Sequence, residues 1–151
     1  MEALSKHKEE MAVIRSIRLK EREKVNEDIR DTQSILDSFN GGYNPIITFD
    51  ELSTFEIGQR ISLNENIDIE KTFQNENRVV FITYMKNGGE FGAHSHDCIE
   101  RVKVVRGHLI DRKRGYNTYS QSQELFYAAG EEHEPYATLD SVYIVTFYKT
   151  L

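Results

Sequence analysis

Hydrophobic residues recur with two different periods along this chain, and the period changes near residue 40. Before that point, six apolar residues recur at roughly helical spacing among many Glu, Lys and Arg: Leu4, Met11, Ile14, Val25, Ile29 and Leu36. The segment from Met1 to Phe39 also contains no Gly or Pro. This pattern predicts a long, charged, amphipathic α-helix over residues 1–40. We expect Gly41 and Gly42 to end it, because Gly is favoured just past a helix.

After Gly42 the hydrophobic period becomes two. Val79, Phe81, Thr83 and Met85 would share one face of a strand, and the run from Val142 to Tyr148 is β-branched or aromatic at nearly every position. Turn signals separate the strands at Asn87-Gly88-Gly89, Arg106-Gly107 and Ala129-Gly130. Short strands with regular turns predict an all-β domain over residues 41–151, built as a sandwich or a barrel.

The predicted helix needs a surface to cover its apolar stripe, because a helix of this kind is marginal alone in water. The stripe is interrupted between Arg18 and Arg22. One alternative is that it packs on the β domain of its own chain. The other, which we favour, is that it packs on a second copy of the chain or on another protein, since one small β domain rarely needs a long extra helix.

Composition restricts the partners and the compartment. The 151 residues carry a net charge of −6 and a sequence pI near 5.4, which argues against nucleic acid as the main partner. No apolar run approaches the ~20 residues needed to cross a membrane, and the charged first twenty residues argue against a secretory signal. Cys98 is the only cysteine, so no internal disulfide can form. We expect a cytoplasmic protein or part of an intracellularly assembled complex.

The candidate chemistry centres on three histidines and a glutamate. Side chains two residues apart on a strand share a face, so His94 and His96 can point at one ion. Glu100 has the same parity and can reach that ion if the chain bends at Asp97-Cys98. His133, after Gly130-Glu131-Glu132, adds a third imidazole. Three imidazoles and one carboxylate suit a divalent transition ion (Fe, Mn, Co, Ni, Cu or Zn) and leave coordination positions open for a ligand.

These residues resemble the cupin signature. The first cupin motif, G-x5-H-x-H-x3,4-E-x6-G, is matched in full by Gly88, His94, His96, Glu100 and Gly107. The second motif, G-x5-P-x-G-x2-H-x3-N, is matched only in part. It keeps Gly130 and His133, whereas Ser122, Ala128 and Ala137 stand where Gly, Pro and Asn are usual.

The resemblance implies a cupin-type jelly-roll barrel from Gly41 to Leu151, with a metal at its mouth held by His94, His96, Glu100 and His133. It leaves the reaction open, because the family includes dioxygenases, isomerases, epimerases, lyases, storage proteins and ligand-sensing domains. We therefore expect a metal-binding cupin domain that binds or transforms a small polar molecule. If it is an enzyme, it would be an oxygenase, a lyase or an isomerase, with catalytic residues that the sequence does not assign.

The alternative function is a structural or interaction protein that assembles through its helix and carries a cupin-type head. A ligand-sensing domain of a transcription factor is weaker, since no helix-turn-helix pattern is present and the charge is wrong for DNA.

Several other polar and aromatic residues have two interpretations. Arg106 has the parity of inward residues and could grip a substrate carboxylate, or it could be exposed at the strand end. Cys98 is expected to point away from the metal, His108 to start a strand, and Glu131 and Glu132 to form a solvated turn. Six aromatic residues could pack in the core or line a cavity: Phe81, Tyr84, Phe91, Phe126, Tyr143 and Phe147.

Overall fold

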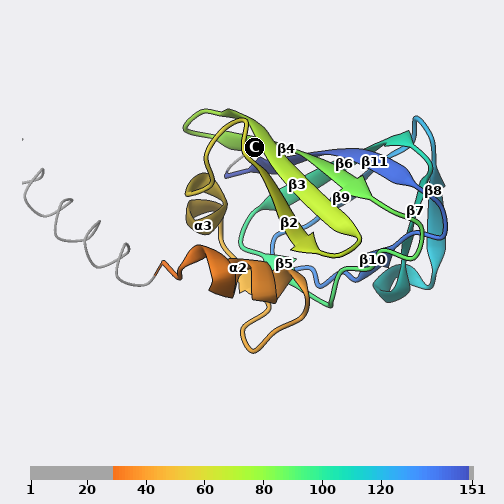
Figure 1. Cartoon of the computed structure of the whole chain (residues 1–151), viewed down its shortest axis with the longest axis horizontal. Coiled ribbons are helices and arrows are strands. Elements are labelled where there is room, and N and C mark those ends of the chain that lie inside the picture. Colours follow the sequence, from red (N-terminus) through yellow and green to blue (C-terminus); the bar gives the residue numbers. More distant parts are fainter. Residues whose placement is uncertain (1–28, 150–151) are drawn as a thin grey trace, which may run out of the picture. The chain divides into compact units, whose positions relative to one another are not determined.

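The computed structural model describes residues 29–149, in which β-strands are much more common than helices (Figure 1). The helices are α2 (Thr32–Phe39), α3 (Phe49–Ser53) and a 3-10 turn η1 (Arg112–Arg114). The strands are β1 (Ile46–Ile47), β2 (Arg60–Asn64), β3 (Ile67–Gln74), β4 (Arg78–Met85), β5 (Ser95–His96), β6 (Ile99–Arg106), β7 (His108–Asp111), β8 (Asn117–Ser120), β9 (Glu124–Tyr127), β10 (Pro135–Tyr136) and β11 (Ser141–Tyr148). The predicted β-rich class is confirmed.

The strands form three sheets. The largest is antiparallel and has the order β2-β3-β4-β11-β6-β9; a second has the order β10-β7-β8, and β1 pairs in parallel with β5. Alternation decides which side chains enter the core. On β4, Val79, Phe81, Thr83 and Met85 are buried, as their spacing predicted. On β6 the buried positions include Glu100, so the same alternation turns a carboxylate inward.

The predicted N-terminal helix lies mostly outside the described residues, and its last part differs from the prediction. Asp31 has an extended backbone (φ −67°, ψ 164°), and its side chain accepts a 2.8 Å hydrogen bond from the Ser34 backbone N–H. Asp31 therefore caps a new helix, because an extended N-cap residue starts a helix and does not continue one. A continuous helix through residue 31 is not what the structure shows.

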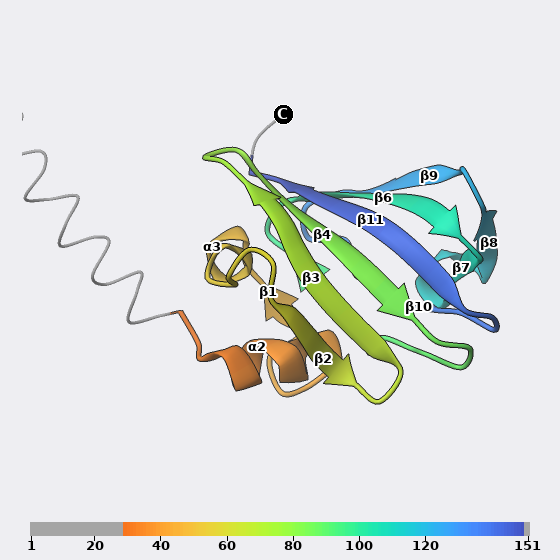
Figure 2. The same cartoon turned by 45° about the horizontal axis from the view of Figure 1, so that its top comes forward.

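Helix α2 packs into the β-rich unit, which begins at Asp31 and not at the predicted Gly41. Its buried residues include Ile35, Leu36 and Phe39. Leu36, which we had placed on a partner-facing stripe, is thus a core residue. Leu4, Met11, Ile14 and Val25, the members of the stripe before Ile29, lie outside the described residues. Figure 2 shows α2 beside β1 and β2.

The end of α2 is fixed to the loop that leads to β5. Gly92 donates its N–H to the Phe39 carbonyl at 3.0 Å. The two segments approach so closely that a Cβ at Gly92 would lie 2.2 Å from the carbonyl carbon of Asn40. Only glycine permits this contact. It sets the position of the Gly92 carbonyl, two residues before His94.

Helix α3 is hydrogen-bonded to the bend that separates His96 from Glu100. The Phe49 N–H donates to Asp97 Oδ1 at 2.7 Å, so the residue after His96 holds the start of α3. At the C-terminal end of α3, the buried Lys71 ammonium donates to the carbonyls of Ser53 and Phe55 at 2.9 and 2.8 Å. Burial lowers the pKa of Lys71. Across the part of the chain that the structure describes, no helix is long and apolar enough to cross a membrane.

Candidate metal centre

Three buried imidazoles converge at one end of the cavity that the sheets enclose. The ligand nitrogens of His94, His96 and His133 all lie within 4.8 Å of one another. Backbone hydrogen bonds bring the two halves of the site together: His94 and His133 each donate an N–H to the other's carbonyl, at 3.0 and 2.9 Å. The Gly130 N–H also donates to the His96 carbonyl at 2.7 Å. Residues almost forty positions apart in sequence therefore meet through main-chain contacts.

Each of the three rings is oriented by a backbone carbonyl. The Nδ1 atoms of His94, His96 and His133 lie 2.7, 3.0 and 3.1 Å from the carbonyl oxygens of Gly92, Ile47 and Glu131. A carbonyl oxygen can only accept, so each Nδ1 must carry the hydrogen. A neutral ring then keeps its lone pair on Nε2, which is the arrangement of a metal-binding histidine with its supporting contact.

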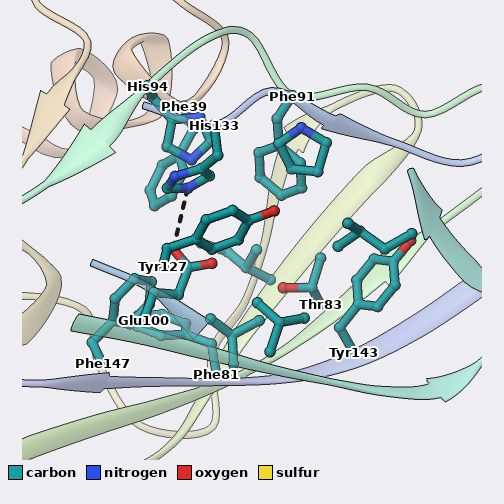
Figure 3. Close-up of a pocket in the computed structure, with 15 residues that line it drawn as sticks. Phe39, Phe81, Thr83, Phe91, His94, Glu100, Tyr127, His133, Tyr143 and Phe147 are labelled. Atoms are coloured by element: carbon teal, nitrogen blue, oxygen red, sulfur yellow. Dashed lines mark ion pairs between the residues drawn. The ribbon is translucent and has the colours of Figure 1, made fainter. Parts of the chain in front are cut away.

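Glu100, on β6, lies beside two of these imidazoles, although only the three histidines have all their candidate ligand atoms within 4.8 Å of one another. Its Oε1 lies 3.1 Å from His96 Nε2. It also lies 3.2 Å from His133 Nε2, an ion pair that Figure 3 marks with a dashed line. Despite these short separations, the three atoms have no hydrogen-bond partner, although all are buried. Buried polar atoms are normally paired. Ligand atoms about 2.1 Å from one ion lie about 3.0 Å apart when their bonds to it are perpendicular. The spacing and the missing hydrogen bonds both fit atoms that face a shared cation.

Burial and the neighbouring groups determine the protonation states of the histidines and of Glu100. Burial, with the other two imidazoles, holds the pKa of His94 well below its usual value. Burial alone would raise the pKa of Glu100, but His133 and His96 lower it far below the usual range. Burial alone would lower the pKa of His133, but the Glu100 carboxylate, helped by the Glu131 carbonyl and Asp111, raises it. At neutral pH the site therefore holds a carboxylate and at least one neutral imidazole.

A second layer of contacts fixes His133, and sequence reasoning missed it. The ring of Tyr127 stacks on that of His133, with centroids 4.2 Å apart and planes 17° apart. The Tyr127 hydroxyl donates to Asp111 Oδ2 at 2.7 Å, and Asp111 Oδ1 accepts the N–H of Glu134 at 3.0 Å. The guanidinium carbon of Arg114 lies 4.4 Å from the Tyr127 ring centroid. The alternation of β9 could have indicated Tyr127, whereas Asp111 lies just before the charged turn Arg112–Arg114 and gives no such signal.

The cluster of histidines with Glu100 opens onto a small, mostly apolar cavity of about 40 Å³. Four of the six aromatic residues proposed from sequence line it: Phe81, Phe91, Tyr143 and Phe147. The other two do not. Tyr84 lies under the guanidinium of Arg60 at 3.8 Å, and Phe126 is 52% exposed. We had expected a polar ligand, but these walls suit one whose body is largely apolar.

Of the two interpretations of Arg106, exposure at the strand end is the one that the structure shows, and this side chain does not line the cavity. The reason is a register shift in the pairing of β6 with β11, where Val142 pairs with Arg106 and Tyr143 with Val104. The shift places an extra residue, Val105, between two pairs, and simple alternation fails across such a bulge. Both Val105 and Arg106 are consequently exposed.

The remaining candidates lie where a structural role would put them. Cys98 is buried at the predicted bend, outside the histidine cluster, and burial raises the pKa of its thiol. His108 begins β7, and its Nε2 accepts the Thr138 N–H at 2.9 Å. Glu131 forms two contacts with the Arg114 guanidinium, at 3.0 and 3.1 Å. Glu132 pairs with Lys113 at 2.9 Å.

Solved cupin structures share this architecture. An RmlC-like cupin from Shewanella frigidimarina aligns with a TM-score of 0.57 and 15% identity, over 64% of this chain and 91% of its own. KdgF from a Halomonas species gives 0.55 and 14% over 62% and 89%, and an acetylacetone dioxygenase from Acinetobacter johnsonii gives 0.53 and 16% over 63% and 71%. The chain therefore has the cupin fold, and the resemblance in its sequence is confirmed at that level.

At the level of sequence, no family model and no curated protein matches the chain. Identities of this size show a shared fold and do not transfer an activity. The function has to be inferred from the site of this chain itself.

Proposed function

We propose that this protein is a metal-binding cupin that binds a small molecule next to one divalent transition ion. His94, His96, Glu100 and His133 would hold the ion. The observation that carries the proposal is the convergence of three buried atoms that make no hydrogen bond: His96 Nε2, His133 Nε2 and Glu100 Oε1. The Nδ1 atoms of both imidazoles are engaged by backbone carbonyls. A scaffold would gain nothing from such a group, because unpaired buried polar atoms destabilise a fold.

The donor set favours a particular range of ions. Three imidazole nitrogens and one carboxylate oxygen suit Fe, Mn, Co, Ni, Cu or Zn, and they leave positions open in five- or six-coordinate geometry. When bound, the ion would act as a Lewis acid toward an oxygen of the ligand. The chain supplies the four donors, fixes their orientation and surrounds the ligand with apolar walls that exclude water.

The two tyrosine hydroxyls that line this cavity are poorly suited to proton transfer. Both tyrosine hydroxyls in its lining already donate, Tyr127 to Asp111 and Tyr143 to the carbonyl of His108. Burial raises the pKa of each hydroxyl, so neither is a ready base near neutral pH. The geometry therefore favours binding and polarisation of the ligand.

Elemental analysis of protein purified without a metal-affinity tag tests this proposal. We expect close to one first-row transition ion per chain, and loss of most of it in His96→Ala. His108→Ala is the matched control, because that imidazole contacts Thr138 and is not in the cluster. Wild-type protein that stays metal-free after incubation with Fe, Mn, Co, Ni and Zn salts would overturn the proposal.

The second candidate, an interaction protein that assembles through its N-terminal segment, depends on Leu4, Met11, Ile14 and Val25. It is compatible with the metal site, since the two roles use different residues. We keep it as a proposal about homo-oligomerisation or docking on another protein, to be tested by mass in solution.

A further inference from the structure

Thr83 places a hydroxyl among the walls of the apolar cavity. It lies on β4 and is 3% exposed, and its side chain lines the same cavity as His94, Glu100 and His133. Among residues 29–149, no group forms a hydrogen bond with this hydroxyl. The Tyr127 and Tyr143 hydroxyls of the same cavity are both satisfied. Thr83 therefore differs from the two tyrosines of the cavity, whose hydroxyls both donate a hydrogen bond.

The local environment does not explain a threonine here. Thr83 pairs with Ile69 on β3 and with Tyr143 on β11, and both neighbours are buried. A valine would have nearly the same shape and would place only apolar atoms beside these neighbours, so packing on them does not require the hydroxyl. Figure 3 shows the Thr83 oxygen turned into the pocket, on the side away from His94 and His133. The hydroxyl is thus available to a molecule bound between them.

We propose that Thr83 is the second polar anchor of the ligand and determines its class. The inference rests on the proposed function: one oxygen-bearing group of the ligand binds the metal, and a second group at its other end hydrogen-bonds to Thr83. The second group must be neutral, because no Lys or Arg lines the cavity to balance a second negative charge. The ligand is then a small molecule with an apolar centre and a hydroxyl, carbonyl or amide at the far end. Dicarboxylates and phosphate esters are excluded.

Matched probes on the cobalt(II)-loaded protein test this assignment. The pairs are 3-hydroxypropionate with butyrate and 4-hydroxybutyrate with pentanoate, which differ by a hydroxyl in place of a methyl group. Dissociation constants are read from the visible absorption of the bound cobalt. The wild-type protein should prefer the hydroxylated member of at least one pair. Thr83→Val should reduce that preference about tenfold, the value of one ordinary hydrogen bond.

Two controls separate the possible failures. Thr83→Ser keeps a hydroxyl and should retain the preference, and succinate should bind no more tightly than butyrate. Cobalt content should be equal in all three proteins, because Thr83 is not a metal ligand. If the wild-type protein takes up no cobalt, the proposed function fails and this inference fails with it. If cobalt binds but the preference is the same in wild type and Thr83→Val, or no probe binds, only the role of Thr83 is overturned.

Discussion

His94 and His133 are joined by a reciprocal pair of backbone hydrogen bonds, each N–H donating to the other's carbonyl at 3.0 and 2.9 Å. The main chain therefore brings two of the four proposed ligands together. A site built in this way does not depend on the ion to bring its donors together, unlike small domains that fold only around their metal.

Removing the metal should consequently leave the fold intact. Chelation followed by gel filtration is expected to give protein with an unchanged circular dichroism spectrum and a lower melting temperature. Restoring an ion at a thousand times its Kd should raise the free energy of unfolding by about 4 kcal/mol. Unfolding on chelation would instead mean that the backbone pairing of His94 and His133 is too weak to hold the site.

Metal affinity should fall as the pH falls. The ligands bind as neutral imidazoles, and the pKa of His133 is raised above its usual value by Glu100 in the metal-free protein. His133 therefore holds a proton up to a pH above the ordinary histidine pKa of about 6.5, and the metal must displace it. Affinity should decline through that range and further below it, as measured by competition titration from pH 8 to pH 5.5. A flat profile would indicate binding without histidine.

Replacing Gly92 with alanine should weaken the site without touching a ligand. A Cβ there would meet the backbone of Asn40 at 2.2 Å, so the loop must move, and with it the carbonyl that orients His94. Loss of such a supporting contact typically lowers metal affinity 10- to 100-fold. Gly58→Ala is the control. Gly58 has a positive φ of 84°, but nothing lies within 4 Å of its Cβ position, so this variant should lose some stability and no metal affinity.

Tyr127→Phe should destabilise the protein while keeping the aromatic stack on His133. The variant removes the hydroxyl that donates to Asp111 Oδ2 and leaves that oxygen, on a fully buried residue, without its partner. An unpaired buried acceptor costs about 1–3 kcal/mol, which urea denaturation can resolve. Tyr84→Phe, on the opposite face of the sheet, should change the free energy of unfolding by much less. Equal losses in the free energy of unfolding for the two variants would show that the contact between Tyr127 and Asp111 has no special role.

The assembly proposal predicts that Ile14→Glu combined with Val25→Glu weakens association, by several kcal/mol if both sites are buried in an interface. The β-rich unit should stay folded and keep its metal, because it begins at Asp31. Mass in solution, measured for both proteins over a range of concentrations, decides the question. A wild-type chain that remains a monomer at high concentration argues against self-association.

The strands and the proximity of the three histidines could be predicted because their signals are local. Alternation on β4 and the i, i+2 spacing of His94 and His96 are properties of short stretches, and both appear in the structure. The bend at Asp97-Cys98 likewise follows from the need to bring Glu100 round to the histidines.

The features that the sequence did not predict depend on contacts between segments far apart in sequence. Parity alone left the orientation of Arg106 open, because that orientation follows from a register shift against Val142 on another strand. Leu36 was misplaced because helical spacing marks an apolar stripe without saying what covers it. Asp111 gave no signal at all, since its importance comes from Tyr127 and Glu134, each more than a dozen residues away.

The packing of α2 determines where this protein can be divided. Phe39 is both a core residue and part of the wall of the cavity, and the Asn40 amide donates to the carbonyl of Leu63 on β2 at 2.9 Å. A fragment that starts at Gly41 would lose that wall and expose the apolar surface it covers. A fragment that starts at Asp31 keeps the helix together with its cap. The first residue for a crystallisation or labelling fragment should therefore be chosen at Asp31, ahead of the paired glycines that mark the boundary in the sequence.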